Sequence, residues 1–234
     1  MSTWSNVVRL QLTHWRTSMM LMWANMAAVF AVEVAIVALI RVHLPPTAAS
    51  GSYVGGSAVI FVYFLLFGVL GTTRALPFAL ALGVTRRAYY TGAAVLAIGL
   101  AAANGLVLAL LGVLERATGG WWLGVHMFRV PWILDGPWYL SWLTAFVLLA
   151  LSFLYGMWLG LVQRRWGALI LGALMATQAT VLVAAVLAIT WAHAWAGVGR
   201  FFTDLTAQGL TGVLAGVALL LLAGGYGTIR RATV

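Results

Sequence analysis

The chain has 234 residues, of which 64% are hydrophobic and only 7% are charged. Ordinary soluble domains carry roughly 25% charged residues, so this composition excludes a soluble globular protein and indicates an integral membrane protein. The net charge of +9 comes from thirteen arginines without any lysine. Because these arginines lie at the ends of apolar segments, they indicate membrane topology and contact with lipid headgroups, and we expect no nucleic-acid partner.

The first 17 residues predict a helix that lies in the membrane interface. Trp4, Val8 and Leu12 share one helical face, and Arg9 and Arg16 lie on another. Such a pattern is typical of a helix that rests on a bilayer surface. A frayed polar leader is the alternative interpretation.

Six apolar runs follow, and each is about as long as a helix that crosses a hydrocarbon core of roughly 30 Å. They cover residues 18–40, 55–73, 91–114, 139–162, 167–191 and 209–228. The expected fold is therefore an all-α integral membrane protein with six transmembrane helices. No tract of soluble composition is long enough for a second domain, so residues 1–234 are expected to form a single transmembrane domain.

The arginines predict which side of the membrane each end faces. Nine lie on the side shared by both termini: Arg9, Arg16, Arg74, Arg86, Arg87, Arg164, Arg165, Arg230 and Arg231. The other four, Arg41, Arg116, Arg129 and Arg200, fall on the opposite side together with Glu115, Asp135 and Asp204. Since cytoplasmic loops carry the excess of positive residues, both termini are expected in the cytoplasm.

The two larger external connections differ in kind. Residues 42–54 contain Pro45 and Pro46 and indicate a plain loop. Residues 115–138 carry four tryptophans, a residue that prefers the headgroup zone, so they predict an external loop lying on the outer interface. A lid over a substrate is the alternative for this segment. The tryptophans are Trp121, Trp122, Trp132 and Trp138.

Motifs for catalysis are missing from the sequence. It contains no G-x-S-x-G, no H-E-x-x-H, no paired aspartates on facing helices and no G-x-x-x-x-G-K-[ST]. The four histidines are solitary, and the absence of cysteine excludes thiolate metal sites. We therefore expect no enzyme activity, cofactor or metal in this chain, and any ATP must be bound by another chain.

Few polar side chains interrupt the apolar runs. Glu33 lies about two turns inside the outer end of the first run, where a carboxyl is costly unless it is paired, protonated or facing water. It is either a polar point on a substrate or proton route or a structural group that bonds to a neighbouring helix. Asn25, Asn104 and Gln178 are expected to hydrogen-bond between helices, and some of them to line a substrate path.

Two G-x-x-x-G patterns, Gly156 with Gly160 and Gly212 with Gly216, are candidates for close contact between helices. Glycine at that spacing allows two helix backbones to approach each other.

Residues 74–90 join the second and third apolar runs and are the most informative segment. They are apolar between their arginines but too short to cross a bilayer. Pro77 suits a first helical turn, and Gly83 is placed to end a short helix in a left-handed conformation. This helix is either an interfacial turn resting on lipid or an apolar knob that fits a groove on a cytoplasmic partner.

Residues 76–90, the N-terminal interfacial helix and residues 164–167 together resemble the permease subunits of ABC-2 type exporters, in particular small six-helix proteins of the bacterial cytoplasmic membrane. The resemblance implies that the loop after the second span is a coupling helix docking on a separate ATP-binding subunit, which would hold ATP and Mg. The residues implied in that contact are Leu76, Pro77, Phe78, Leu82, Arg86 and Arg87.

The resemblance also implies a second permease, either another copy of this chain (a homodimer) or a homologue, and export of a hydrophobic or amphiphilic substrate. Two alternatives stay open. The chain could be a membrane assembly or regulatory protein without transport of its own, or an ATP-independent carrier.

Overall fold

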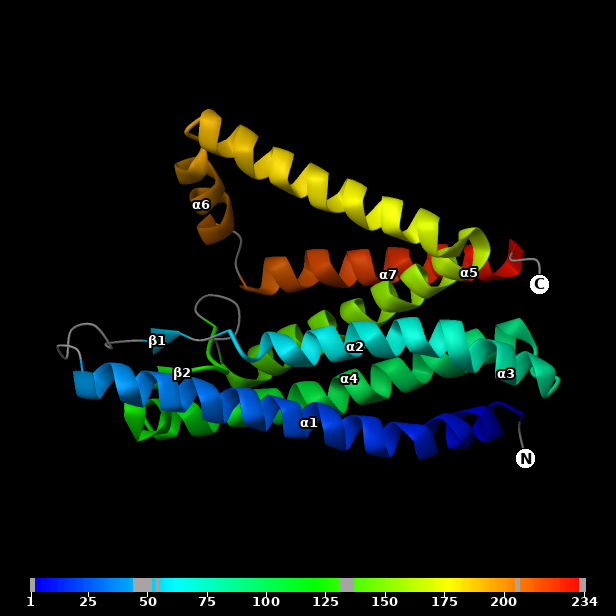
Figure 1. Ribbon diagram of the computed structural model, residues 1–234, viewed down its shortest axis with the longest axis horizontal. Helices are drawn as coiled ribbons and strands as arrows, with labels where there is room; N and C mark the ends of the chain where they lie inside the picture. Colours follow the sequence, from blue (N-terminus) through cyan, green and yellow to red (C-terminus); the bar gives the residue numbers. More distant parts are fainter. Residues whose placement is uncertain (1–2, 44–51, 54, 131–136, 205–206, 232–234) are drawn as a thin grey trace.

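The computed structural model describes residues 3–43, 52–53, 55–130, 137–204 and 207–231, most of which are helical (Figure 1). Four helical segments of this part of the chain are long and apolar enough to cross a membrane: Ser18–Ile40, Ala58–Ala81, Arg86–Ala117 and Trp138–Trp191. The expectation of a largely helical membrane protein is therefore confirmed. The elements are α1 (Thr3–His43), β1 (Ser52–Tyr53), α2 (Ala58–Leu70), the π-helical turn η2 (Gly71–Ala75), α3 (Leu76–Ala81), α4 (Arg86–Ala117), the turn η3 (Gly120–Gly124), β2 (Val125–His126), α5 (Trp138–Trp191), α6 (Trp195–Asp204) and α7 (Ala207–Arg231).

Helix α5 has 54 residues, more than twice the roughly 20 that cross a bilayer, and it is broken at one glycine. Gly167 has φ 84° and ψ 171°, a backbone conformation that only glycine adopts readily. Figure 1 shows the chain reversing direction there. Residues 138–166, the inner arm, lie within the bundle, and residues 168–191, the outer arm, diverge from it.

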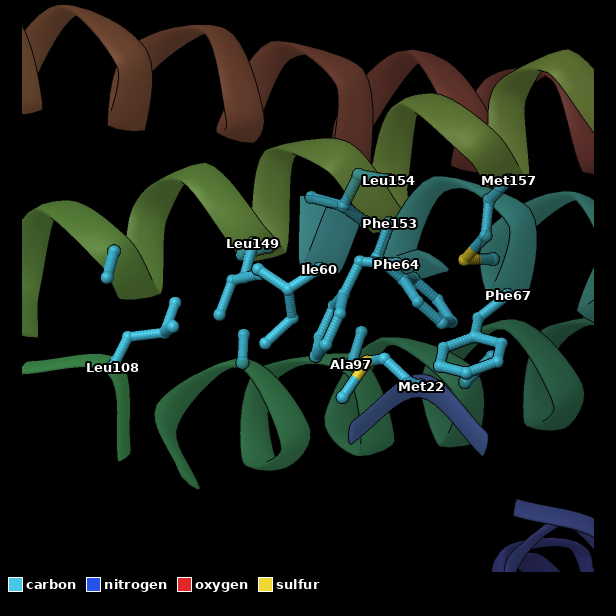
Figure 2. Close-up of a cluster of buried hydrophobic side chains, with 14 of the residues drawn as sticks. Met22, Ile60, Phe64, Phe67, Ala97, Leu108, Leu149, Phe153, Leu154 and Met157 are labelled. Atoms are coloured by element: carbon cyan, nitrogen blue, oxygen red, sulfur yellow. The ribbon is translucent and has the colours of Figure 1, made fainter. Parts of the chain in front are cut away.

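The inner arm is the centre of the core, because α2, α4 and α7 all pack against it. Figure 2 shows side chains of α2 and the inner arm meeting above α4 and Met22 of α1. By contrast, no side chain of residues 163–201 is buried, and this whole stretch is described. The labelled core residues are Met22, Ile60, Phe64, Phe67, Ala97, Leu108, Leu149, Phe153, Leu154 and Met157.

Glycines bring α2 and the inner arm into backbone contact. A Cβ atom added at Gly156 would lie 2.0 Å from the Leu65 carbonyl oxygen, and one at Gly68 would lie 2.1 Å from the Phe153 carbonyl oxygen. Gly160 continues this seam, since its Cβ would lie 2.8 Å from Cβ of Thr72. The contact predicted for the first G-x-x-x-G pattern is confirmed.

The second G-x-x-x-G pattern has no such neighbour. A Cβ at Gly212 or Gly216 would meet nothing within 4 Å. The predicted close contact at these two glycines is therefore wrong within the described chain, because the side of α7 on which they lie is not covered by another helix.

The two ends of the bundle differ in their charges. The start of α1, helix α3, the turn between the two arms of α5 and the end of α7 lie at one end in Figure 1, which we call the α3 end. The strands, η3 and α6 lie at the opposite end. Helix bounds place Arg74, Arg86, Arg87, Arg164 and Arg165 at the α3 end, and Arg116, Arg129 and Arg200 at the other.

Helix α1 joins the expected interfacial segment to the first apolar run, whose predicted bounds match the candidate span Ser18–Ile40. It runs without a break from Thr3 to His43, so no turn separates an interfacial helix over 1–17 from the first apolar run at 18. The physical reason is that residues 3–43 contain neither proline nor glycine to end a helix there.

The second apolar run also extends beyond its predicted end at residue 73. Helix α2 continues through η2 into α3, and the backbone dihedrals of Gly71 (−55°, −46°) and Leu76 (−60°, −48°) are helical at both junctions. Arg74 lies within this continuous helix, because an arginine side chain does not interrupt helical hydrogen bonding. Helix α3 is thus the end of a long helix and not a separate surface helix.

The loop expected over 42–54 makes one pairing with the tryptophan-rich segment. Ser52 and Tyr53 form a short parallel bridge with Val125 and His126. Residues 44–51 and 54 lie outside the described part of the chain.

Candidate functional site

Helix α3 divides the predicted contact residues between two faces. Leu76 and Ala79 are buried against the bundle, whereas the side chains of Phe78 and Leu82 are 54% and 60% exposed. Pro77 occupies the first turn, as predicted. Leu76 is therefore an anchor of the helix, and Phe78 with Leu82 is the exposed apolar pair.

A specific turn holds the end of α3. Gly83 has φ 80°, in the left-handed region, and the Val84 and Gly83 amides donate to the carbonyls of Ala79 and Leu80 at 3.0 Å each. This pair of bonds is a Schellman motif, which satisfies the last carbonyls of a helix. The left-handed end predicted at Gly83 is confirmed, and it fixes the position of the exposed pair.

Helix α4 starts two residues later with a side-chain cap that the sequence analysis missed. The hydroxyl oxygen of Thr85 accepts a hydrogen bond from the Ala88 amide at 3.2 Å. The signal was present in the sequence, because threonine is a favoured residue just before a helix. Arg86 and Arg87 form the first turn of α4, with Arg87 exposed and Arg86 partly exposed.

The π-helical turn η2 links α3 to α4. The buried Tyr89 hydroxyl donates to the Gly71 carbonyl at 2.6 Å, and the Leu76 amide donates to the same oxygen. Such π-turns occur often at functional sites, since they hold a locally irregular backbone in place. Helix α3 is therefore connected both to α2, through the continuous helix, and to α4, through the hydrogen bond from Tyr89.

The intramembrane polar residues are held in separate pairs. Trp23 donates its indole N–H to the Asn104 side-chain oxygen at 3.0 Å, which joins α1 to α4. Asn25 donates to the Tyr63 hydroxyl, which joins α1 to α2. Each of these hydrogen bonds joins two helices, which is the packing contact expected for Asn104 and Asn25.

Gln178 makes a contact between the two arms of α5. Its side-chain oxygen accepts a hydrogen bond of 2.6 Å from the Tyr155 hydroxyl. Tyr155 and Gln178 are nearly equally far from Gly167 along the chain. Their hydrogen bond therefore links the inner and outer arms at a point away from the break. Thr177 and Thr180 instead donate to carbonyls of their own helix.

Glu33 lies against the start of α2. A Cβ at Gly56 would lie 2.6 Å from its Oε2 atom, and the Gly56 backbone hydrogen-bonds to the carboxyl. Oε2 itself is enclosed and makes no hydrogen bond within the described chain. Because the N-terminal end of a helix carries partial positive charge, a carboxylate is stabilised there. Glu33 therefore has a structural partner at a helix start, and one oxygen atom that this partner leaves unused.

Glu115, which the sequence predicted only as an external charge, is buried and accepts hydrogen bonds through both of its carboxylate oxygens. Its side chain is 0% exposed. Oε2 accepts from the Phe128 amide at 2.8 Å and the Met127 amide at 3.0 Å. Oε1 accepts from the Arg129 amide at 3.3 Å and lies 3.3 Å from Nδ1 of His126.

These donors explain how a carboxylate can be buried in the last turn of α4, where the partial negative charge of a helix end opposes it. The same hydrogen bonds attach residues 127–129, where the chain turns back, to the end of α4. Only one signal pointed to this site in the sequence: Gly119 and Gly120 shortly after Glu115 allow the chain to turn back. Both have positive φ.

In the same turn, the side chains of two adjacent tryptophans point in different directions. Trp121 and Trp122 have φ of 57° and 58°, a left-handed conformation that costs roughly 1–2 kcal/mol for each residue other than glycine. Trp121 points inward and stacks edge-on with Phe30 at a centroid distance of 5.0 Å, while Trp122 is 82% exposed. Trp132 lies outside the described residues.

No protein-family model, curated protein or solved structure matches the chain. Among the described residues, no three histidine, aspartate or glutamate side chains lie close enough to hold a metal ion.

Proposed function

We propose that this chain is the transmembrane subunit of an ATP-driven exporter and works with a separate ATP-binding subunit. One observation carries the proposal: Phe78 and Leu82 are exposed on a capped helix end, at the end of the bundle where arginines gather. Apolar anchors at helical spacing suit a groove on a partner protein.

The α3 end would face the cytoplasm, because arginine excess marks the cytoplasmic side. The inner and outer arms would each cross the membrane, and α7 would provide the sixth span. Both termini would then lie on the cytoplasmic side of a bacterial inner membrane.

The contacts of α3 support a mechanical role. When the ATP-binding subunits close on ATP and Mg, a push on Phe78 would reach α2 through the continuous helix, and α4 through the bond from Tyr89 to Gly71. Helix α2 would pass it to the inner arm across the close contact at Gly68 and Gly156. A second permease, either another copy or a homologue, would complete the pathway for a hydrophobic or amphiphilic substrate.

Replacing Phe78 with aspartate is expected to reduce capture of the ATP-binding subunit at least about tenfold, because a charge in an apolar contact costs well over 1.4 kcal/mol. The measurement is co-purification of the tagged chain with a co-expressed candidate ATP-binding subunit, chosen from the genes that flank its own. The control is Trp122→Asp, which alters an exposed aromatic residue at the opposite end, and aspartate tolerates the left-handed backbone there. Equal capture by both variants would refute the docking role of α3.

An ATP-independent carrier is the second candidate, and it is favoured by the Oε2 atom of Glu33, which makes no hydrogen bond among the residues that the structure describes. If the exporter proposal holds, Glu33→Gln should leave the ATPase rate of the reconstituted complex within about twofold, because glutamine still accepts from Gly56. The expected loss of stability is about 0.3–1 kcal/mol from the helix-dipole contact.

The carrier alternative predicts a different result in vesicles that contain this chain alone. An imposed proton gradient would then collapse with the unmodified chain and persist with Glu33→Gln. That pair of results would contradict the exporter proposal, and a dye that reports internal pH measures both.

A further inference from the structure

A groove lies between α4 and the inner arm, which pack side by side (Figure 1). The two helices are in backbone contact at Gly105, where an added Cβ would lie 3.0 Å from the Phe146 amide nitrogen. Nearer the end of the bundle away from α3, a partly open hollow of about 300 Å³ lies between them. This volume is at the lower limit of small-molecule sites, so the groove suits a narrow ligand. The residues that shape it are Leu108, Ala109, Gly112, Arg116, Trp138 and Ala145.

Small residues leave the groove open. The side chains of Ala109 and Ala145 are buried, and Gly112 has none. A Cβ atom added at Gly112 would lie 3.7 Å from the Phe128 carbonyl oxygen, which is an ordinary contact distance. The packing of α4 therefore does not require glycine at this position, and a larger side chain there would fill the groove.

The groove is apolar at its deep end and charged at its mouth. Leu108 and Ala145 lie about two turns inside their helices. Arg116 is in the last turn of α4, and Trp138 is the first residue of α5. Both side chains are exposed. Because both helices are long and apolar enough to cross a membrane, the mouth lies at the level of the headgroups, where tryptophan is preferred.

We propose that this groove binds an anionic phospholipid of the leaflet away from α3, with part of one acyl chain between α4 and the inner arm and the phosphate beside Arg116. A guanidinium group suits a phosphate in charge and in geometry. A zwitterionic lipid would also bring an ammonium group toward the arginine, so an anionic headgroup is favoured. The inference concerns a lipid of the bilayer and does not depend on the proposed exporter activity.

The carboxylate next to Arg116 does not oppose such a headgroup. Glu115 is buried, and its oxygens accept hydrogen bonds from the amides of residues 127–129. Its charge is thus compensated inside the protein and shielded from the headgroup layer. The exposed positive charge of Arg116 remains at the mouth of the groove.

Lipid-specific fluorescence quenching tests the site, because the chain has no cysteine and can be labelled at one position. A small fluorophore on Val113→Cys, at the exposed edge of the groove, would report on quenching by phosphatidylglycerol or phosphatidylcholine that carries a nitroxide on its acyl chain. Phosphatidylglycerol is expected to bind there about fivefold more strongly. A label on Leu182→Cys, an exposed residue of the outer arm, should show no preference.

Two changes, each made in the chain labelled at residue 113, separate the charge from the shape of the groove. Arg116→Gln should abolish the preference for phosphatidylglycerol, because it removes the charge at the mouth. Gly112→Leu should also abolish it, because the new side chain occupies the space of the acyl chain. Gly99→Leu is the matched control on the same helix, since a Cβ at Gly99 would meet nothing within 4 Å, and it should keep the preference.

Three results would overturn the proposal. Equal quenching by the two lipids at residue 113 of the otherwise unmodified chain would mean that the site does not select an anionic headgroup. A preference that survives Gly112→Leu would mean that the groove holds no acyl chain. Quenching by neither lipid would mean that a protein surface, such as a second copy of the chain, covers the groove.

Discussion

Replacing Gly156 with alanine is expected to destabilise the protein by about 3 kcal/mol or more. The new Cβ would lie 2.0 Å from the Leu65 carbonyl oxygen, which is a backbone atom and cannot rotate away as a side chain can. Helices α2 and α5 would have to separate along the seam, and such overpacking typically costs about 1–3 kcal/mol, occasionally more. The measurement is thermal unfolding in detergent, where a loss of this size lowers the midpoint by roughly 6–12 °C.

Gly216→Ala is the matched control for this prediction. It changes the same residue type in the same G-x-x-x-G pattern, but its Cβ would meet nothing within 4 Å. Because alanine has the higher helix propensity, this variant should unfold at the same temperature or slightly higher. If the two variants had equal midpoints, the close approach of α2 and α5 would be wrong.

Replacing Glu115 with glutamine is expected to cost on the order of 3 kcal/mol and to loosen the turn that follows α4. Both carboxylate oxygens act only as acceptors, for the amides of Met127, Phe128 and Arg129. The amide nitrogen of glutamine cannot accept a hydrogen bond, so at least one of these backbone amides loses its partner. Hydrogen bonds to charged groups contribute about 1.5–3 kcal/mol each.

Hydrogen exchange of a peptide covering residues 120–130 measures this effect locally. Exchange should be accelerated about a hundredfold, which corresponds to roughly 2.7 kcal/mol of lost protection. Arg116→Gln is the control, because it removes the charge of the neighbouring exposed residue and leaves the carboxylate in place. Unchanged exchange in Glu115→Gln would show that the carboxylate does not hold the turn.

Several features could be predicted because they are encoded locally. A run of apolar residues long enough for a bilayer predicts a helix, and all six predicted runs have their central parts in helices. Gly83 ends α3 as expected, since only glycine enters the left-handed region without strain. The break at Gly167, where two predicted runs meet, follows from the same property.

Other features depend on which segment covers which face, and local patterns do not contain that information. The two G-x-x-x-G patterns are equivalent in sequence, yet only Gly156 and Gly160 meet another helix. Within the contact segment, the family resemblance implied both Leu76 and Phe78 as contact residues, but the bundle buries Leu76 and exposes Phe78. Which of the two side chains is buried depends on which side of α3 faces the other helices, and the spacing of residues does not contain that information.

The sequence by itself determined that this is a helical membrane protein, with arginines concentrated at one set of helix ends and a short apolar segment between the second and third runs. Helix length, charge and glycine conformation each depend on a few neighbouring residues, so they can be predicted from the sequence without knowledge of the tertiary structure. Only the tertiary structure decided that Glu115 is buried, that Glu33 lies at the start of α2, and that the outer arm and α6 stand outside the core. Each of these depends on contacts between residues that are distant in the chain.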